Sequence, residues 1–158
     1  MLPTPKHSVI LGSFNRPRMI RGAIESVLGQ TDQEWELIVT DDGSNDETID
    51  SIRECMAGDN RCRLLRHPRD LEDSKRRTDC GNRAVQRIND AIPLVRGEVV
   101  HYLADDDWYA LNRFEIFNEL FANPEVVCGY GRLLCTEATG AKVIKELYYK
   151  EVPDPYCH

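Results

Sequence analysis

Short apolar runs alternate along the chain with stretches in which apolar residues recur every three or four positions. Apolar runs of four to eight residues bounded by turn-forming residues are typical of buried strands, whereas recurrence every three or four positions is typical of a helix. We expect strands at residues 8–14, 35–40, 62–66 and 98–103.

The stretches between these runs predict helices with recognisable ends. Pro17 suits the first turn of a helix and Gly29 suits the position after its last turn, so a helix is expected between them. Ser44 and Glu47 have the spacing of a capping box, which predicts a second helix that begins at Ser44. Two more helices are expected at residues 84–92, before Pro93, and at residues 112–121.

This order of elements predicts an α/β fold with a mainly parallel sheet and helices on both of its faces. The later part of the chain adds two expected strands, residues 126–134 and 141–149, joined by the turn-like sequence TEATG. Residues 71–78 lack apolar periodicity and are expected to form a polar, mobile loop. At 158 residues the chain fits one domain.

Chemically distinctive loops follow three of the expected strands. In such sheets, ligands bind beyond the carboxyl ends of the strands. The three loops are GSFNR at 12–16, DDGSND at 41–46 and ADDDW at 104–108. Their expected convergence at one edge of the sheet is the first argument for a binding site.

The run of three aspartates at 105–107 has two open interpretations. If strand alternation continues, Asp105 and Asp107 share a side and Asp106 points away. Two such carboxylates suit Mg²⁺ or Mn²⁺, which would turn their mutual repulsion into binding. The alternative is a solvated acidic turn in which Asp107 caps the next helix.

The second acidic loop is also open to two interpretations. A carboxylate at the end of a strand can accept the imide N–H of uracil, or the N1–H and amino group of guanine. However, Asp, Gly, Ser and Asn are common turn formers, and this loop has a helix to cap.

Charge is unevenly distributed in this acidic chain. The formal net charge of −7 argues against a general nucleic-acid binder, so no nucleic-acid partner is expected. Nine of the twenty Lys and Arg residues nevertheless fall between positions 61 and 87. This segment is either a solvated basic face or an anion-binding rim. For a rim, Arg77 and Arg83 are the candidates to contact a diphosphate, and a helix-surface position is the alternative for each.

Other patterns exclude classes of site and of location. The six cysteines form no CxxC pair, which argues against a zinc site and a disulfide framework. No apolar run has the length of a transmembrane helix and no signal peptide is evident, so we expect an intracellular, cytoplasmic protein. His101 is expected to be a core histidine, and Trp108 and Tyr109 are expected to pack against the following helix.

Two long segments together resemble a known family. SVILGSFNRPRMIRGAIESVLGQTDQEWELIVTDDGSNDET resembles the opening of the family 2 glycosyltransferases, and NRAVQRINDAIPLVRGEVVHYLADDDWY resembles their segment leading into the DXD metal motif. The nearest likeness is to a spore-coat polysaccharide glycosyltransferase of this family. The resemblance implies the three-layer, Rossmann-like GT-A fold, with residues 1–110 as the nucleotide- and metal-binding half and 111–158 as a partial second half. The resemblance further implies a chain that is truncated relative to the family.

The resemblance also implies an activity and roles for particular residues. The activity is the inverting transfer of a sugar from a nucleoside diphosphate, UDP being favoured, to a hydroxyl of a saccharide or other acceptor, with Mn²⁺ or Mg²⁺. By this resemblance, Asp42 would bind the base and Asp106 would hold the metal. For the metal, the family analogy therefore favours Asp106, whereas strand alternation favours Asp105 with Asp107. The nucleotide-binding candidates are Gly12, Ser13, Phe14, Arg16, Asp41, Asp42, Arg77, Arg83 and Asp105, and the metal candidates are Asp105, Asp106 and Asp107.

The resemblance places the catalytic base and the acceptor site in the second half of the family's chain. Glu137 is a candidate base only by default, and a homo-oligomer or a partner chain could complete the acceptor site. The alternatives are a nucleotide-sugar-binding fragment without complete transferase activity, a sugar nucleotidyltransferase, and a receiver-type signalling module whose acidic pair binds Mg²⁺.

Overall fold

The computed structural model describes residues 4–68, 80–129, 133–136 and 143–147. The chain divides into two compact units, Met1–Asn118 and Glu119–His158. The polar loop expected at 71–78 lies outside the described residues. Among the described helices, none is long and apolar enough to cross a membrane.

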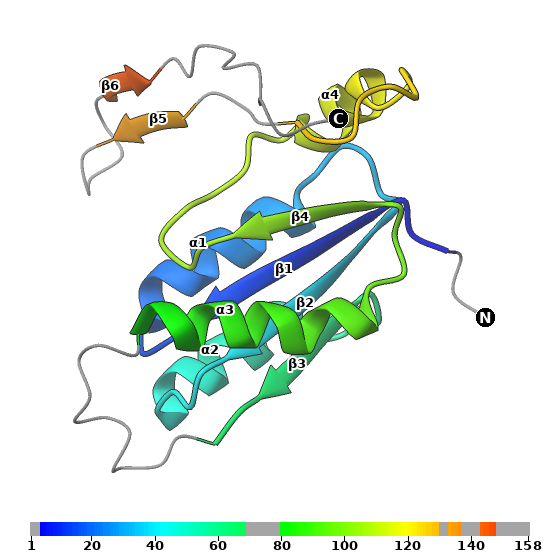
Figure 1. Ribbon diagram of the computed structural model, residues 1–158. Coiled ribbons are helices and arrows are strands. Elements are labelled where there is room, and N and C mark those ends of the chain that lie inside the picture. Colours follow the sequence, from blue (N-terminus) through cyan, green and yellow to red (C-terminus); the bar gives the residue numbers. More distant parts are fainter. Residues whose placement is uncertain (1–3, 69–79, 130–132, 137–142, 148–158) are drawn as a thin grey trace. The chain divides into compact units, whose positions relative to one another are not determined.

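Four parallel strands form the sheet of the first unit, in the order β3-β2-β1-β4 (Figure 1). They confirm all four strands expected from the apolar runs. β1 and β2 are buried along nearly their whole length, as parallel strands covered on both faces are. Their bounds are β1 His7–Ser13, β2 Trp35–Asp41, β3 Cys62–Arg66 and β4 Val99–Leu103.

Helices cover both faces of this sheet, as Figure 1 shows. Val9 and Leu11 of β1 belong to the larger core cluster, which α1 and α2 complete on one face. Ile10, between them in sequence, packs with Ala91 of α3 on the other face. The helices are α1 Pro17–Leu28, α2 Asp46–Met56, α3 Cys80–Ala91 with the short 3₁₀ helix η2 Ile92–Leu94, and α4 Arg113–Leu120.

Strand register brings the three distinctive loops to one edge of the sheet. Ser13 of β1 is the register partner of Asp41 in β2, and Leu11 is the partner of Leu103 in β4. All these pairings are parallel, so the carboxyl ends of β1, β2 and β4 lie together. The loops that follow the three strands therefore begin side by side.

The start of α2 differs by one residue from the expected position. Asn45 is the N-cap, because its side chain accepts a hydrogen bond from the backbone N–H of Thr48 at 3.1 Å. The hydroxyl of Ser44 instead accepts from the backbone N–H of Asn15 at 2.9 Å. Ser44 is thus taken up by a tertiary contact, and its neighbour caps the helix. The expected ends of α1, Pro17 and Gly29, are confirmed.

The second unit contains a two-stranded antiparallel sheet of β5 (Leu133–Thr136) and β6 (Val143–Leu147). The strand expected at 126–134 begins later than predicted, because residues 126–129 are not in a strand.

A hydrogen-bonded histidine pair lies inside the first unit. Nδ1 of His7 is 2.9 Å from Nε2 of His101, and both residues are buried. Nε2 of His7 is 3.0 Å from Oδ1 of Asn118, whose amide donates to Asp32 at 2.6 Å. Because Oδ1 of Asn118 can only accept, His7 carries its proton on Nε2, and Nδ1 accepts from His101. His101 is therefore a satisfied core histidine, as expected.

The two aromatic residues after the acidic run have different environments. Tyr109 is buried, and its hydroxyl donates to the carbonyl of Tyr102 at 2.6 Å. Trp108 is 58% exposed. The expectation that both pack against the following helix is therefore wrong for Trp108.

Candidate functional site

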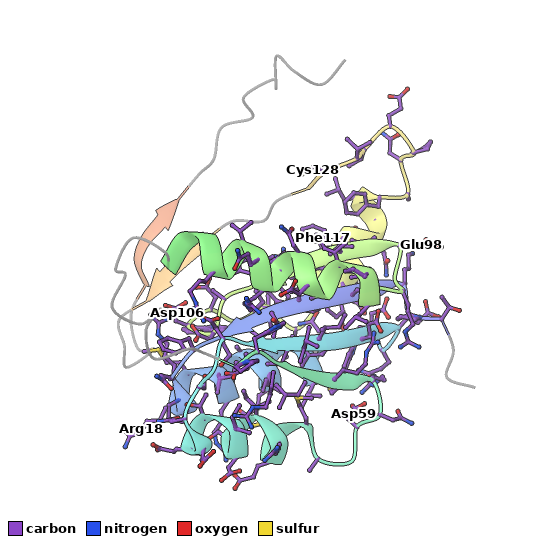
Figure 2. All side chains as sticks on the ribbon, turned by 60° about the horizontal axis from the view of Figure 1, so that its bottom comes forward. Arg18, Asp59, Glu98, Asp106, Phe117 and Cys128 are labelled. Atoms are coloured by element: carbon purple, nitrogen blue, oxygen red, sulfur yellow. The ribbon has the colours of Figure 1, made fainter. Side chains whose placement is uncertain are left out.

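A cavity of about 260 Å³ lies at the carboxyl edge of the sheet, where the loops after β1, β2 and β4 meet α3. Figure 2 shows Asp106 at this edge, and Asp59 and Glu98 at the opposite edge. The expected convergence of the three loops is confirmed. Six residues chosen from the sequence line the cavity: Gly12, Ser13, Phe14, Arg16, Asp42 and Asp105.

An arginine from the loop after β1 pairs with two of the three carboxylates in the acidic turn after β4, residues 105–107. Nη1 of Arg16 lies 2.9 Å from Oδ1 of Asp105 and 2.6 Å from Oδ2 of Asp106. The backbone N–H of Phe14 donates to Oδ2 of Asp105 at 3.2 Å. These contacts offset the repulsion between neighbouring carboxylates.

In the acidic turn, the carboxylates of Asp105 and Asp106 meet at the same arginine nitrogen. Strand alternation had instead predicted that Asp105 and Asp107 share a side. The reason is that β4 ends at Leu103, so the three aspartates lie beyond the strand and its alternation. Asp105 is 8% exposed, and burial raises its pKa more than its hydrogen bonds lower it. Burial also raises the pKa of Asp107, and the negative charges of Asp106 and Asp105 raise it further.

Two arginines of α3 hold Asp42 at another part of the cavity wall. Arg83 donates from Nε to Oδ2 and from Nη2 to Oδ1 of Asp42, each at 2.9 Å. Nε of Arg87 lies 3.6 Å from Oδ1 of Asp42, and its Nη1 lies 3.1 Å from Oδ2 of Asp90. The side chains of Asp42 and its two arginines are all less than one-fifth exposed. Arg83, chosen from the sequence to contact a diphosphate, is thus the partner of Asp42 in this structure.

Asp41 holds the loop after β2 and does not line the cavity. It is fully buried, and its Oδ2 accepts from the backbone N–H groups of Gly43 and Ser44 at 3.1 and 3.0 Å. Gly43 has a φ of 80°, the left-handed conformation that glycine adopts without strain. Asp41 therefore presents its neighbour Asp42 on a fixed turn.

Hydrogen bonds between backbone N–H groups and side-chain oxygens tie the loops after β1 and β2 together. Besides the bond from Asn15 to Ser44, the backbone N–H of Asn45 donates to Oδ1 of Asn15 at 2.8 Å. Asn15 has a φ of 51°, a conformation that asparagine tolerates better than most residues.

Ser13 offers an uncommitted polar group at the cavity wall. Ser13 is one of the lining residues, and it is only 5% exposed. Its hydroxyl has no hydrogen-bond partner among the described residues. Because buried hydroxyls are normally paired, this group is a candidate to turn toward a ligand.

Sequence reasoning missed the remaining lining residues. Arg87 could have been found, because it lies four residues after Arg83 and so shares its helix face. Tyr102 could also have been found, since alternation along β4 places it opposite the buried His101. The missed residues are Thr40, Ala84, Arg87, Ile88, Tyr102 and Ala104. Two predicted site residues, Arg77 and Glu137, lie outside the described residues.

The acidic turn suits a hard divalent cation. No group of three His, Cys, Asp or Glu side chains gathers to hold a metal within the described parts of the chain. Mg²⁺ and similar cations, however, are commonly bound by one or two carboxylates together with waters and phosphate oxygens. Asp105 and Asp106 meet this requirement, because both approach one point, occupied here by Nη1 of Arg16.

Comparison with known proteins points to one family. The sequence profile of Glycosyl transferase family 2 matches residues 8–152. Protein CgeD of Bacillus subtilis (strain 168) is 34% identical over 131 residues, which cover 80% of this chain and 29% of CgeD. The UDP-Glc:alpha-D-GlcNAc-diphosphoundecaprenol beta-1,3-glucosyltransferase WfgD of Escherichia coli is 29% identical over 124 residues, 78% of this chain and 44% of WfgD. The chain thus spans less than half the length of either relative.

Solved structures share the fold. S. aureus TarS 1-349 in complex with UDP matches with a TM-score of 0.58 and 22% identity, covering 74% of this chain and 32% of that one. Mannosyltransferase PcManGT from Pyrobaculum calidifontis, in complex with GDP-Man and Mn²⁺, matches with a TM-score of 0.61 and 20% identity, covering 84% and 36%. These likenesses confirm the expected GT-A fold.

Proposed function

The chain belongs to glycosyl transferase family 2, and from this membership we propose that its cavity binds a nucleoside-diphosphate sugar, with UDP favoured, for transfer to an acceptor hydroxyl. One observation carries the proposal: Asp42 and Asp105, from the loops after β2 and β4, line the same cavity. A UDP-sugar is favoured because the E. coli relative is named for UDP-Glc. A family can host several activities, so the geometry of the site supports the proposal beside the family membership.

Asp42 is the residue proposed to recognise the base. Each carboxylate oxygen has two lone pairs, so Asp42 keeps acceptor capacity while Arg83 donates one hydrogen bond to each oxygen. The imide N–H of uracil or the N1–H of guanine would donate to it. The two guanidinium contacts fix the orientation of the Asp42 carboxylate.

The acidic turn is proposed to receive the diphosphate. A divalent cation held by Asp105 and Asp106 would stabilise the charge that develops on the leaving diphosphate. The hydroxyl of Ser13 would donate to a ligand oxygen, and the guanidinium of Arg16 would add a charged donor at the same wall.

The proposed reaction is a displacement with inversion at the anomeric carbon. The acceptor hydroxyl forms the new C–O bond on the face opposite the diphosphate, the bond to the diphosphate breaks, and a general base takes the hydroxyl proton. Glu137 remains the sequence candidate for that base. The acceptor, a cytoplasmic location and a partner chain at the acceptor site also remain proposals.

Calorimetry with UDP, GDP and TDP, each with and without Mn²⁺, tests the donor site. We expect binding of UDP that depends on Mn²⁺. Absence of metal-dependent binding for all three nucleotides would contradict the proposal. Release of UDP from a UDP-sugar then distinguishes transfer from binding alone, whereas release of pyrophosphate from UTP and a sugar phosphate would favour a nucleotidyltransferase.

A further inference from the structure

One guanidinium nitrogen lies between the two carboxylates of the acidic turn. Nη1 of Arg16 is 2.9 Å from Asp105 and 2.6 Å from Asp106. The side chain of Arg16 is 47% exposed, as is that of Asp106, whereas that of Asp105 is 11% exposed. The arginine therefore covers the acidic turn from the solvent side, and it can leave without disturbing the core.

Arg16 and a divalent cation cannot hold the same two oxygens at once. Mg²⁺ lies about 2.1 Å from its oxygen ligands, nearer than Nη1 lies to either carboxylate. A cation between Asp105 and Asp106 would take the place of Nη1, and the two positive charges would repel each other at contact distance. Cation binding therefore requires the side chain of Arg16 to move.

The backbone around Arg16 is fixed, so this movement involves the side chain alone. The preceding residue, Asn15, is bonded through its N–H to Ser44 and through its side chain to the N–H of Asn45. The following residue, Pro17, begins α1. Rotation of the Arg16 side chain leaves these contacts in place.

The cavity offers a destination for the displaced guanidinium. Arg16 lines the same cavity as Ser13 and Asp105. A diphosphate that enters with its cation brings oxygens that a guanidinium binds with two parallel hydrogen bonds. We propose that Arg16 is a resident counter-ion of the acidic turn, which gives up Asp105 and Asp106 to the cation and transfers to the donor diphosphate. This inference rests on the proposed function.

The exchange makes cation and nucleotide binding depend on each other. A cation that binds alone must displace Arg16 into water, whereas a cation that arrives with a diphosphate supplies Arg16 with new partners. Such coupling is reciprocal, so each ligand raises the affinity for the other.

Manganese titration of Arg16→Gln tests the exchange, with Arg18→Gln as the matched control. Arg18 is an exposed arginine of α1, labelled in Figure 2. The paramagnetic resonance signal of free Mn²⁺ reports metal binding, first without nucleotide and then with UDP. For Arg16→Gln we expect about threefold to tenfold tighter binding of Mn²⁺ alone and about tenfold weaker binding of UDP at saturating Mn²⁺. Arg18→Gln should change neither affinity by more than about twofold.

Opposite effects on the two affinities are the signature of the exchange. An Arg16→Gln variant that binds Mn²⁺ alone no more tightly than the wild type overturns the inference. An unchanged UDP affinity in this variant overturns the transfer to the diphosphate. If the wild type binds no nucleotide with Mn²⁺, the proposed function itself has failed, and the comparison of Mn²⁺ alone still shows whether Arg16 competes with the cation.

Discussion

Arg83 donates one hydrogen bond to each carboxylate oxygen of Asp42, so a single guanidinium fixes the plane of that carboxylate at the cavity wall. Two-point contacts of this kind combine charge with a defined direction. The carboxylate therefore faces the cavity in an orientation that is set before any ligand arrives.

Asp42→Asn is predicted to weaken UDP binding by about tenfold to a hundredfold, the value of a charge-assisted hydrogen bond. The amide keeps the shape of the side chain, but it loses the negative charge and one acceptor oxygen. Calorimetry with UDP and Mn²⁺ measures the effect. Asp50→Asn is the control, because Asp50 lies on α2 with its side chain 66% exposed. Equal UDP affinities for the wild type and Asp42→Asn would remove Asp42 from the base site.

Two buried serines of β1 are predicted to behave in opposite ways. The hydroxyl of Ser13 has no partner among the described residues, so Ser13→Ala should leave the free energy of unfolding unchanged or raise it. The same change should weaken UDP binding by about threefold to tenfold, the value of one neutral hydrogen bond.

Ser8 supplies the matched comparison. Its hydroxyl donates to the fully buried carboxylate of Glu36 at 2.7 Å and accepts from the N–H of Gly97 at 2.8 Å. Ser8→Ala should therefore cost about 1–3 kcal/mol of unfolding free energy and leave UDP affinity unchanged. Denaturant unfolding and calorimetry measure the two quantities. If Ser13→Ala loses stability as Ser8→Ala does and retains its affinity, Ser13 is a structural residue.

The elements that the sequence predicted correctly depend on local patterns. The strands of the parallel sheet are continuous apolar runs because both faces are covered, and a run of this kind is visible without knowledge of its neighbours. The loops at their carboxyl ends then follow from topology alone. This is why Asp42 and Asp105 could be assigned to one site before any contact was known.

The contacts that sequence reasoning missed are tertiary contacts. In two cases, two adjacent residues of similar chemistry could each make the contact, and the sequence does not tell which one does. Ser44 and Asn45 can both cap a helix, and the contact of Ser44 with Asn15 leaves the cap to Asn45. Trp108 and Tyr109 are adjacent aromatics, and only Tyr109 reaches the carbonyl of a β4 residue. Arg16 meets Asp105 across the sheet edge, a pairing that depends on the three-dimensional position of the turn after β4.

The histidine pair predicts a loss of stability in acid. Burial, with help from His7 and Arg113, lowers the pKa of His101 to about 3, and burial also lowers the pKa of His7. Unfolded histidines titrate near 6.5, so below that pH the unfolded state binds protons that the folded state excludes. The free energy of unfolding therefore decreases as the pH is lowered. His101 alone contributes a loss of about 2 kcal/mol when the pH drops from 7 to 5.

His101→Phe tests this origin of the acid sensitivity. The variant lacks one of the two excluded protons, so its unfolding free energy should fall less steeply between pH 6.5 and pH 4. Urea unfolding over this range measures the slope for both proteins. The comparison at pH 7.5, where histidines are neutral in both states, gives the cost of the substitution itself. Parallel curves would mean that other groups cause the acid sensitivity.

Replacing glycine with alanine is predicted to lower the unfolding free energy at Gly97 and to raise it at Gly22. A Cβ at Gly97 would lie 2.8 Å from the carbonyl carbon of His7 and from the backbone nitrogen of Ser8. Backbone atoms of a buried strand cannot move aside cheaply, so Gly97→Ala should cost about 1–3 kcal/mol of unfolding free energy. A Cβ at Gly22, within α1, would meet nothing within 4 Å. Gly22→Ala should therefore stabilise the protein by up to about 1 kcal/mol, because alanine favours a helix interior over glycine.

Thermal unfolding of both variants decides whether close packing at Gly97 holds the start of β4 against β1. The two changes add the same single methyl group, so a difference in sign isolates the effect of the surroundings. UDP affinity should stay unchanged in both variants, since neither glycine lines the cavity. A Gly97→Ala protein as stable as the wild type would show that the strands separate enough to admit a methyl group. In that case the alignment of the acidic turn with the loop after β1 would need another cause.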